Sequence, residues 1–230
     1  MVVAIERYSR NQNSITREEN IVLKNSSVCI IGCGGLGGYI IETLARIGIG
    51  LITVVDGDTF DISNLNRQLL SDEESIGFNK ALIAKNRMSK VNSEIKVIAI
   101  PEMLTETNGM DIINNHDVVI DALDSIKTRL LLDKLCEKAN IPLVHGSIGG
   151  WYGQVATIYP GDGTLRKIYK EGIDKGMEVT LGNLSFVAAN IASIEASEAV
   201  KVILNKGVTL RNKLLVIDFL DMEQQIIDLK

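Results

Sequence analysis

The sequence predicts an α/β protein with a Rossmann-like, doubly wound and mostly parallel sheet, followed by antiparallel strands near the C-terminus. Three observations lead to this fold class. Short apolar runs alternate with helical patterns as far as residue 145, a glycine-rich turn joins the first run to the next helix, and two further strand patterns stand close together at the end of the chain. Strands buried on both faces read as apolar runs, so the alternation indicates strand–helix–strand units of a parallel sheet.

The expected elements follow in a regular order after a short amphipathic helix at residues 17–24. The parallel strands are expected at residues 28–31, 51–55, 95–100, 118–120 and 143–145, with helices between them at residues 36–47, 80–91, 109–115 and 125–139. Gly48 stands where a helix ends in a left-handed cap, and Pro101 closes the third strand. The polar connection 57–78 is long for a compact domain, which is typical of a functional segment.

The C-terminal part has a different pattern. A strand at residues 153–159 is followed by a glycine- and lysine-rich loop at 160–183, a long helix at 185–204, and a pair of strands at 213–219 and 224–229. No repeat, low-complexity tract or linker divides the chain. We therefore expect a single domain over residues 1–230, with residues 1–27 as a helical lead-in and residues 160–183 as a crossover loop.

The composition argues against several classes of protein. Hydrophobic residues make up 46% of the 230 residues, which predicts a packed core, and the net charge of −5 argues against a nucleic-acid partner. The three cysteines, Cys29, Cys33 and Cys136, form no disulfide framework and no Cys-x-x-Cys pair, so we expect no zinc site. Residues 1–10 lack the apolar region of a signal peptide, and no apolar run is long enough to span a bilayer. We expect a cytoplasmic protein without a membrane partner.

The glycine turn is the strongest local motif. Residues 32–37 read Gly-Cys-Gly-Gly-Leu-Gly, follow an expected strand and open an expected helix. Glycines there permit a tight turn and let a phosphate approach the backbone N–H groups at the positive end of the helix. Asp56 ends the next strand, where an acidic residue binds ribose hydroxyls. The pattern favours a nucleotide site over a turn without a ligand, and it does not choose among NAD, FAD, S-adenosylmethionine and ATP.

Charged side chains beyond the turn favour ATP. Arg67, within residues 64–68, and Lys80, at the start of the next helix, both suit a triphosphate, because a guanidinium binds phosphate with two hydrogen bonds and an ammonium acts as a point charge. A dinucleotide dehydrogenase needs neither of them. Each residue taken alone is better interpreted as surface charge.

Two aspartates follow the fourth expected strand. Asp121 and Asp124 stand where the ligand crevice of a doubly wound sheet opens, and a carboxylate there holds Mg²⁺ directly or through water. The alternative is that one of them caps the helix that begins near Ser125. We expect Asp124 to face the metal and Asp121 to be the more structural of the two. His145, at the end of the fifth strand, is interpreted as a hydrogen-bonded structural histidine.

Taken together, these motifs resemble the MoeB/ThiF/HesA family, relatives of the ubiquitin-activating enzymes. The resemblance covers nearly the whole chain, and the order and spacing of the motifs are more specific than any one of them. The matching segments are residues 7–11, 32–37, 56–58, 64–68, 77 with 80, 121–125 with 129, 146–148 with 153–155, and 195–201.

The resemblance implies a homodimeric adenylyltransferase. Such an enzyme uses ATP and Mg²⁺ to activate the C-terminal glycine carboxylate of a small ubiquitin-like sulfur-carrier protein of the ThiS or MoaD type, and releases pyrophosphate. The site residues that it implies are the backbone of Gly34, Gly35 and Gly37 at the phosphates, Asp56 at the ribose, Asn64, Arg67 and Lys80 at the triphosphate with Gln68 supporting the same loop, Asp124 at the metal, and Arg10 reaching the neighbouring subunit's site as an arginine finger.

The chain departs from the family pattern in its cysteines. Many members carry two Cys-x-x-Cys pairs for zinc, and some carry a crossover-loop cysteine that forms a thioester or persulfide. Residues 159–163 and 177–182 contain no cysteine, so we expect a zinc-free enzyme that only adenylates and leaves sulfur transfer to a separate donor. The crossover loop contains four cations that form either a docking surface for an acidic carrier or a solvated surface: Arg166, Lys167, Lys170 and Lys175.

Three alternatives stay open from the sequence. An NAD(P)-dependent oxidoreductase explains the glycine turn and Asp56 but leaves Arg67, Lys80 and Asp124 without a role. A tRNA-modifying dehydratase that acts through an adenylate is compatible with residues 120–125, although the acidic net charge argues against it. A non-catalytic scaffold would bind nucleotide only.

Overall fold

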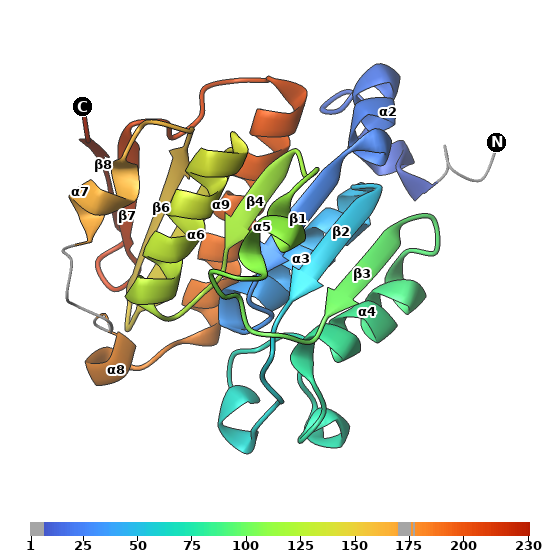
Figure 1. The fold of residues 1–230 in the computed structure, drawn as a ribbon, viewed down its shortest axis with the longest axis horizontal. Helices are drawn as coiled ribbons and strands as arrows, with labels where there is room; N and C mark the ends of the chain where they lie inside the picture. Colours follow the sequence, from blue (N-terminus) through green and yellow to red (C-terminus); the bar gives the residue numbers. More distant parts are fainter. Residues whose placement is uncertain (1–6, 170–175, 177) are drawn as a thin grey trace.

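A computed structural model describes residues 7–169, 176 and 178–230 of the chain (Figure 1). In these residues, eight strands form one sheet in the order β3-β2-β1-β4-β5-β6-β7-β8. Strands β1 to β5 pair in parallel, and β5 to β8 pair antiparallel. The strands are β1 Ser27–Ile31, β2 Leu51–Val55, β3 Lys96–Ile100, β4 Val118–Asp121, β5 Leu143–Gly149, β6 Tyr152–Ile158, β7 Lys213–Asp218 and β8 Glu223–Asp228.

Helices cover both faces of the sheet (Figure 1). Helices α3, α4 and α9 pack with Val28 and Ile30 on one face, whereas α5 and α6 pack with Cys29 and Ile31 on the other. Because successive strand residues point to opposite faces, a strand that is apolar at every position is covered on both sides. The helices are α2 Arg17–Asn25, α3 Gly35–Ile47, α4 Lys80–Val91, α5 Gly109–Ile113, α6 Ile126–Ala139, α7 Thr164–Ile168, α8 Glu178–Leu181 and α9 Ser185–Leu204, with 3-10 turns η1 Ser9–Asn11, η2 Ile62–Asn64 and η3 Glu73–Ser75.

Local sequence sets several helix ends. The side chains of Thr16 and Glu19 form a capping box at the start of α2, and Asn79 accepts a hydrogen bond from the N–H of Leu82 at the start of α4. Gly48 follows α3 with a φ of 97°, a left-handed conformation that glycine adopts without strain. These caps fix where α2 and α4 begin and where α3 ends.

The order of the strands reverses between β1 and β4, and this reversal positions the site. Ile31, the last residue of β1, lies between Val55 of β2 and Asp121 of β4. The N–H of Gly32 donates to the carbonyl of Val55 at 2.8 Å, and the N–H of Ala122 donates to the carbonyl of Ile31 at 2.9 Å. The glycine turn and the residues after β2 and β4 therefore emerge side by side at the edge where doubly wound sheets bind ligands.

The predicted fold class is confirmed, with differences in the C-terminal part. Strand β5 continues past His145 to Gly149, because its extra residues pair with β6 as an antiparallel hairpin. The expected crossover loop contains α7 and α8, each too short to give a helical period in the sequence. Lys170 and Lys175 lie outside the described residues. Among the helices that the structure describes, none combines the length and apolarity needed to cross a bilayer.

Candidate active site

A cavity of about 380 Å³ opens at the carboxyl edge of the sheet, beside the glycine turn. Of the described residues expected at the site, Gly37, Asn64 and Arg10 do not line this cavity. The expected residues that do line it are Gly34, Gly35, Asp56, Arg67, Gln68, Lys80 and Asp124. The structure thus brings together the backbone of the glycine turn and side chains from the polar connection, the start of α4 and the loop after β4.

The glycine turn is shaped by close backbone packing. Gly32 has a φ of 102°, and a Cβ there would lie 2.5 Å from the carbonyl oxygen of Ala122. A Cβ at Gly37 would lie 1.9 Å from the carbonyl oxygen of Gly32, so Gly37 permits the turn to fold back on α3. Gly34 is the N-cap of α3 and supplies no side-chain cap, which leaves the first N–H groups of the helix for an anion.

Asp56 both braces the turn and lines the cavity. Its Oδ2 accepts a hydrogen bond from the N–H of Cys33 at 2.7 Å, and its Oδ1 accepts one from the N–H of Asp58 at 2.8 Å. Burial raises the pKa of the Asp56 carboxyl group, and the two backbone donors partly offset that effect. Asp56 therefore fixes the turn to the end of β2.

The polar connection is held by Asn64 from behind. The Asn64 side chain is buried, and its Oδ1 accepts a hydrogen bond from the N–H of Asp61 at 3.1 Å. Its backbone carbonyl accepts hydrogen bonds from the N–H groups of Arg67 at 3.1 Å and Gln68 at 2.9 Å. Asn64 therefore has a supporting position in this structure, and it presents Arg67 and Gln68 to the cavity.

Arg67 and Gln68 stand opposite the glycine turn. NH1 of Arg67 donates to the carbonyl of Ser63 at 3.0 Å and to Oδ1 of Asn66 at 2.9 Å, which holds the half-buried guanidinium at the cavity wall. Gln68 is buried, and its Oε1 has no hydrogen-bond partner among the described residues. Because a buried polar atom without a partner is costly, it indicates a place for a ligand donor.

Lys80 is the first residue of α4 and points into the same cavity. Its backbone N–H donates to the carbonyl of Asp58 at 3.0 Å, and Nδ2 of Asn79 donates to the carbonyl of Asp56 at 2.9 Å. These contacts join the start of α4 to the loop that follows β2. Lys80 and Arg67, two of the cations that line the cavity, thus come from separate segments that the fold brings together.

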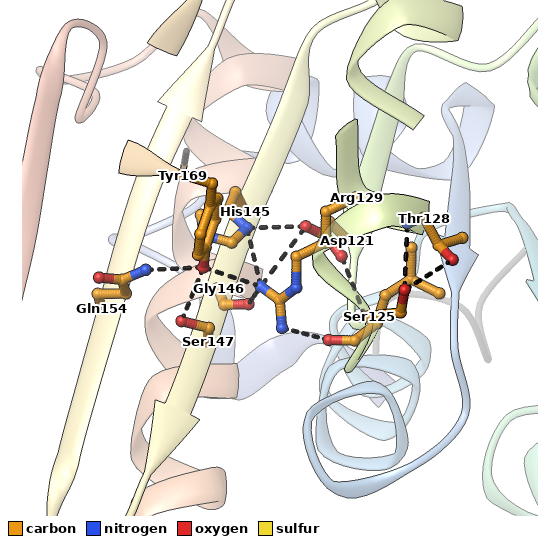
Figure 2. Close-up of polar contacts among 10 residues, drawn as sticks. Asp121, Ser125, Thr128, Arg129, His145, Gly146, Ser147, Gln154 and Tyr169 are labelled. Atoms are coloured by element: carbon orange, nitrogen blue, oxygen red, sulfur yellow. Dashed lines mark hydrogen bonds and ion pairs between the residues drawn. The ribbon is translucent and has the colours of Figure 1, made fainter. Parts of the chain in front are cut away.

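Asp121, the last residue of β4, and Asp124, in the loop that follows, have different environments. Figure 2 shows the contacts of Asp121. Asp121 is fully buried and contacts Nδ1 of His145 at 2.7 Å and NH1 of Arg129 at 3.7 Å, a structural role as expected. Asp124 is exposed and lines the cavity. Helix α6 is capped by the Ser125 side chain, so neither aspartate serves as its N-cap.

The surroundings of His145 indicate a structural role for this residue. His145 is fully buried and hydrogen-bonded, as a structural histidine should be. Burial lowers the pKa of its imidazole and outweighs the neighbouring carboxylate of Asp121. The imidazole is therefore neutral near pH 7.

The whole chain is similar in sequence and structure to known proteins. A sequence model described as the ThiF family matches residues 8–230. The chain belongs to the ThiF family. Among curated members, it is 34% identical over 223 residues to the SAMP-activating enzyme E1 of Haloferax volcanii, covering 95% of this chain and 83% of that protein. It is 33% identical over 228 residues to the sulfur carrier protein adenylyltransferase of Thermus thermophilus, covering 94% and 84%.

Other ThiF-family relatives are longer. The adenylyltransferase and sulfurtransferase MOCS3 of Dictyostelium discoideum is 37% identical over 221 residues, but this chain spans only 52% of its length. The crystal structure of E. coli MccB with ATP is 27% identical, with a TM-score of 0.82 over 97% of this chain and 70% of that chain. The family resemblance is confirmed, and the chain is an adenylyltransferase of the ThiF/MoeB type.

The cysteines of this ThiF-family chain are all buried. Burial raises the pKa of the Cys33 and Cys136 thiols well above the ordinary value, and the pKa of Cys29 is raised for the same reason. A thiol of that kind is protonated at neutral pH and a poor nucleophile. Among the described residues, no group of three or more His, Cys, Asp or Glu side chains could hold a metal ion.

An ion pair holds the start of the crossover segment in this ThiF-family chain. Arg211 forms two hydrogen bonds with Oδ1 and Oδ2 of Asp162, at 2.8 Å and 3.0 Å, and stacks over the Tyr159 ring at 4.6 Å. Asp162 also accepts from the N–H of Tyr159 at 3.0 Å. These contacts tie the segment that follows β6 to the segment that precedes β7.

Sequence reasoning gave no role to several residues that line the cavity. Glu102, Met103 and Leu104 were not identified, although residues 102–104 follow β3 at the carboxyl edge of the sheet, and that position is a usable signal. Asp58 and Arg129 belong to the segments that match the family, but the sequence assigned them no function. Both line the cavity in the structure.

Proposed function

We propose that this protein uses ATP to adenylate the C-terminal glycine carboxylate of a small ubiquitin-like sulfur-carrier protein, with release of pyrophosphate. One observation carries the proposal: Arg67, Lys80 and Asp124 share a cavity with the open N-terminus of α3. The names of two relatives, a SAMP-activating enzyme and a sulfur carrier protein adenylyltransferase, support the choice of acceptor.

The chemistry requires stabilisation of charge rather than a general base. The acceptor carboxylate attacks the α-phosphorus of ATP, the bond to the bridging oxygen breaks, and pyrophosphate leaves. Arg67, Lys80 and the first N–H groups of α3 would balance the negative charge that accumulates there, because fixed cations and dipoles act most strongly in a partly dehydrated cavity. Asp56 would hold the ribose, and Gln68 would meet a ligand donor with its unpaired oxygen.

The donor set of the cavity fits Mg²⁺. Asp124 supplies carboxylate oxygens, which suit this ion, and because Mg²⁺ is usually bound by one or two carboxylates together with substrate phosphates, no cluster of three carboxylates is needed. Asp124 would hold the ion at the cavity. When bound, the ion would add positive charge at the phosphates of the leaving group.

The proposed homodimer, separate sulfur donor and cytoplasmic location rest on the family pattern. Arg10 is exposed in η1 and does not line the cavity of its own chain, which suits an arginine that serves a second subunit of a homodimer. The buried thiols support an enzyme that adenylates and leaves sulfur transfer to a separate donor. We further propose that it acts in the cytoplasm.

Carrier-dependent ATP–pyrophosphate exchange tests the function. The purified full chain is incubated with ATP, Mg²⁺ and each small ubiquitin-like protein with a Gly-Gly terminus from the same genome. We expect exchange with at least one of them, and a fall of about 100-fold or more in Arg67→Ala or Asp124→Ala, because each removes a charge at the reacting phosphate. Arg17→Ala and Asp111→Ala remove exposed charges of the same sign from residues that do not line the cavity, and serve as controls.

The alternatives give different results in the same assay. Exchange that depends on tRNA would favour the dehydratase, and oxidation of NAD(P)H without exchange would favour the oxidoreductase. ATP binding without exchange in the presence of any carrier would leave only a scaffold. Any of these three results contradicts the proposal.

A further inference from the structure

The hydroxyl of Tyr169 connects several elements beneath the cavity (Figure 2). Its oxygen lies 3.1 Å from Nε2 of His145 and 3.2 Å from Oγ of Ser147, and it accepts a hydrogen bond from Nε2 of Gln154 at 2.9 Å. NH1 of Arg129 lies 3.4 Å from the same oxygen. One oxygen atom at the end of α7 therefore contacts side chains of β5, β6 and α6.

The charges in this cluster fix the direction of its hydrogen bonds. Burial alone would raise the pKa of Asp121, but the Arg129 guanidinium and the hydrogen bond from His145 outweigh burial and lower it. The carboxylate of Asp121 is thus ionised beside a neutral imidazole. Because Nδ1 of His145 lies 2.7 Å from Oδ2 of Asp121, Nδ1 carries the proton, and Nε2 is an acceptor for the Tyr169 hydroxyl.

The cluster also holds both backbone groups of Leu123. The Leu123 N–H donates to Oδ1 of Asp121 at 3.0 Å, and its carbonyl accepts a hydrogen bond from NH2 of Arg129. Arg129 is itself held by the carbonyl of Gly146, to which NH1 donates at 2.8 Å. Leu123 directly precedes Asp124, so the cluster sets the path of the loop that presents Asp124 to the cavity.

Helix α7 depends on few other contacts for its position near the cluster. It has five residues, and its apolar contacts are made by the buried Leu165 and the half-buried Ile168. Arg166 and Lys167 make polar contacts with Glu137 and with the carbonyl of Leu229, but both cations are exposed. Exposed ion pairs contribute little, whereas a buried polar group that loses its partner is costly. The Tyr169 hydroxyl is therefore the main polar link between α7 and the cluster.

We propose that Tyr169 is a positioning residue, whose hydroxyl couples the placement of α7 to the loop Leu123–Asp124 through Arg129. The inference rests on the proposed adenylation and adds a residue that acts on the same site without touching the substrate. With the hydroxyl in place, the Arg129 guanidinium contacts Tyr169 and the carbonyl of Gly146, and it donates to the carbonyl of Leu123. Without it, Nε2 of His145 loses a donor and Arg129 loses a neighbour, so the loop gains freedom.

Tyr169→Phe is the test, because it removes one oxygen atom and keeps the ring. Tyr159→Phe is the matched control, since Tyr159 is equally half-buried but stacks against Arg211 outside the cluster. Hydrogen exchange of the Leu123 amide, followed by NMR in the full chain without ligand, measures the coupling between Tyr169 and the loop. We expect exchange about tenfold faster in Tyr169→Phe, as the loss of one buried hydrogen bond implies, with no change in Tyr159→Phe or at the amide of Ile30.

Pyrophosphate exchange, with the carrier that supports it in the wild type, measures the effect of the substitution on the reaction. We expect kcat to fall about tenfold while the KM for ATP changes less than about twofold, because the loop acts on the reacting phosphate rather than on nucleotide affinity. An unchanged Leu123 amide, or equally faster exchange at Leu123 and Ile30, overturns the coupling. Faster Leu123 exchange with an unchanged kcat overturns the positioning role.

The failure of the proposed function would be recognised separately. A wild-type chain without pyrophosphate exchange in the presence of any carrier contradicts adenylation. The hydrogen-exchange comparison needs neither ATP nor a carrier, so it still supports or overturns the coupling between Tyr169 and Leu123.

Discussion

Nζ of Lys80 lies 3.4 Å from Oδ2 of Asp58 at the cavity, with the Lys80 side chain 10% exposed and the Asp58 side chain 55% exposed. Asp58 therefore holds a nearly buried ammonium group in place and partly neutralises it. A triphosphate carries more negative charge than one carboxylate and would compete with Asp58 for Lys80. In the proposed reaction, the pair would thus keep a cation available for phosphate inside a partly apolar cavity.

Removal of this cation is expected to slow the reaction. Lys80→Ala should lower the rate of carrier-dependent pyrophosphate exchange about 100-fold, because a charge at the transferring phosphate is lost. Lys85→Ala removes an exposed lysine from the same helix and should leave the rate unchanged. Steady-state exchange kinetics of both variants check this. Similar rates in the two variants would show that Lys80 has no role at the phosphates.

Mixing two inactive variants tests whether Arg10 acts across a dimer. Arg10→Ala and Asp124→Ala should each be inactive alone. In a mixed dimer, the Arg10→Ala subunit retains Asp124 and receives Arg10 from its partner, so one of the two sites is complete. Random reassociation should then restore about a quarter of the wild-type activity, as expected for shared sites in a symmetric dimer. No recovery, despite mixed dimers demonstrated by mass spectrometry, would place Arg10 outside the partner's site.

The buried carboxyl group of Glu195 predicts a stabilising substitution. Both of its oxygens lack hydrogen-bond partners among the described residues, and burial raises its pKa well above the ordinary value. A folded-state pKa above the ordinary value of 4.5 means that the stability is fully present below about pH 4.5 and is lost as pH rises through the raised pKa. Glu195→Gln cannot ionise, so its free energy of unfolding should fall less than that of the wild type as pH rises above about 4.5.

Glu198 provides the contrast on the same helix. It is also buried, but it accepts hydrogen bonds from Oγ1 of Thr157 and from the N–H of Leu210, and it pairs with Lys201. Glu198→Gln should lower the free energy of unfolding by about 1–3 kcal/mol, since charge-assisted hydrogen bonds are weakened. Denaturant titrations of the wild type and both variants from pH 4 to pH 9 measure the difference. A Glu195→Gln variant as unstable as Glu198→Gln would contradict this prediction.

Asp133 predicts a change of stability in the acidic range. Burial raises its pKa from 3.8 to about 6, despite the nearby guanidinium of Arg166. The stability that its protonated form contributes is present below pH 4 and lost as pH rises through about 6. Asp133→Asn should gain stability relative to the wild type over this range, by at most about 3 kcal/mol and less with solvent screening. Unfolding titrations from pH 4 to pH 7 check it, and parallel curves for the two proteins would refute it.

The order of the elements could be read from the sequence because the signals are local. The helices at 80–91 and 185–204 begin and end where the apolar period predicts. The sequence predicts the extent of an element less well where pairing with a distant strand determines its length. Strand β5 continues to Gly149 only because β6 lies antiparallel to it, and α7 and α8 are too short to show a period.

The sequence by itself determined the doubly wound fold, the glycine turn, and the segments that supply Asp56, Arg67, Lys80 and Asp124. These follow from periodicity and from the rule that ligands bind at the carboxyl ends of parallel strands. Only the tertiary structure decided which side chains face the cavity. It placed Gly37 and Asn64 behind the site and joined Arg129 to Tyr169, 40 residues apart in the chain. The physical reason is that such contacts depend on the packing of distant segments, which no local pattern encodes.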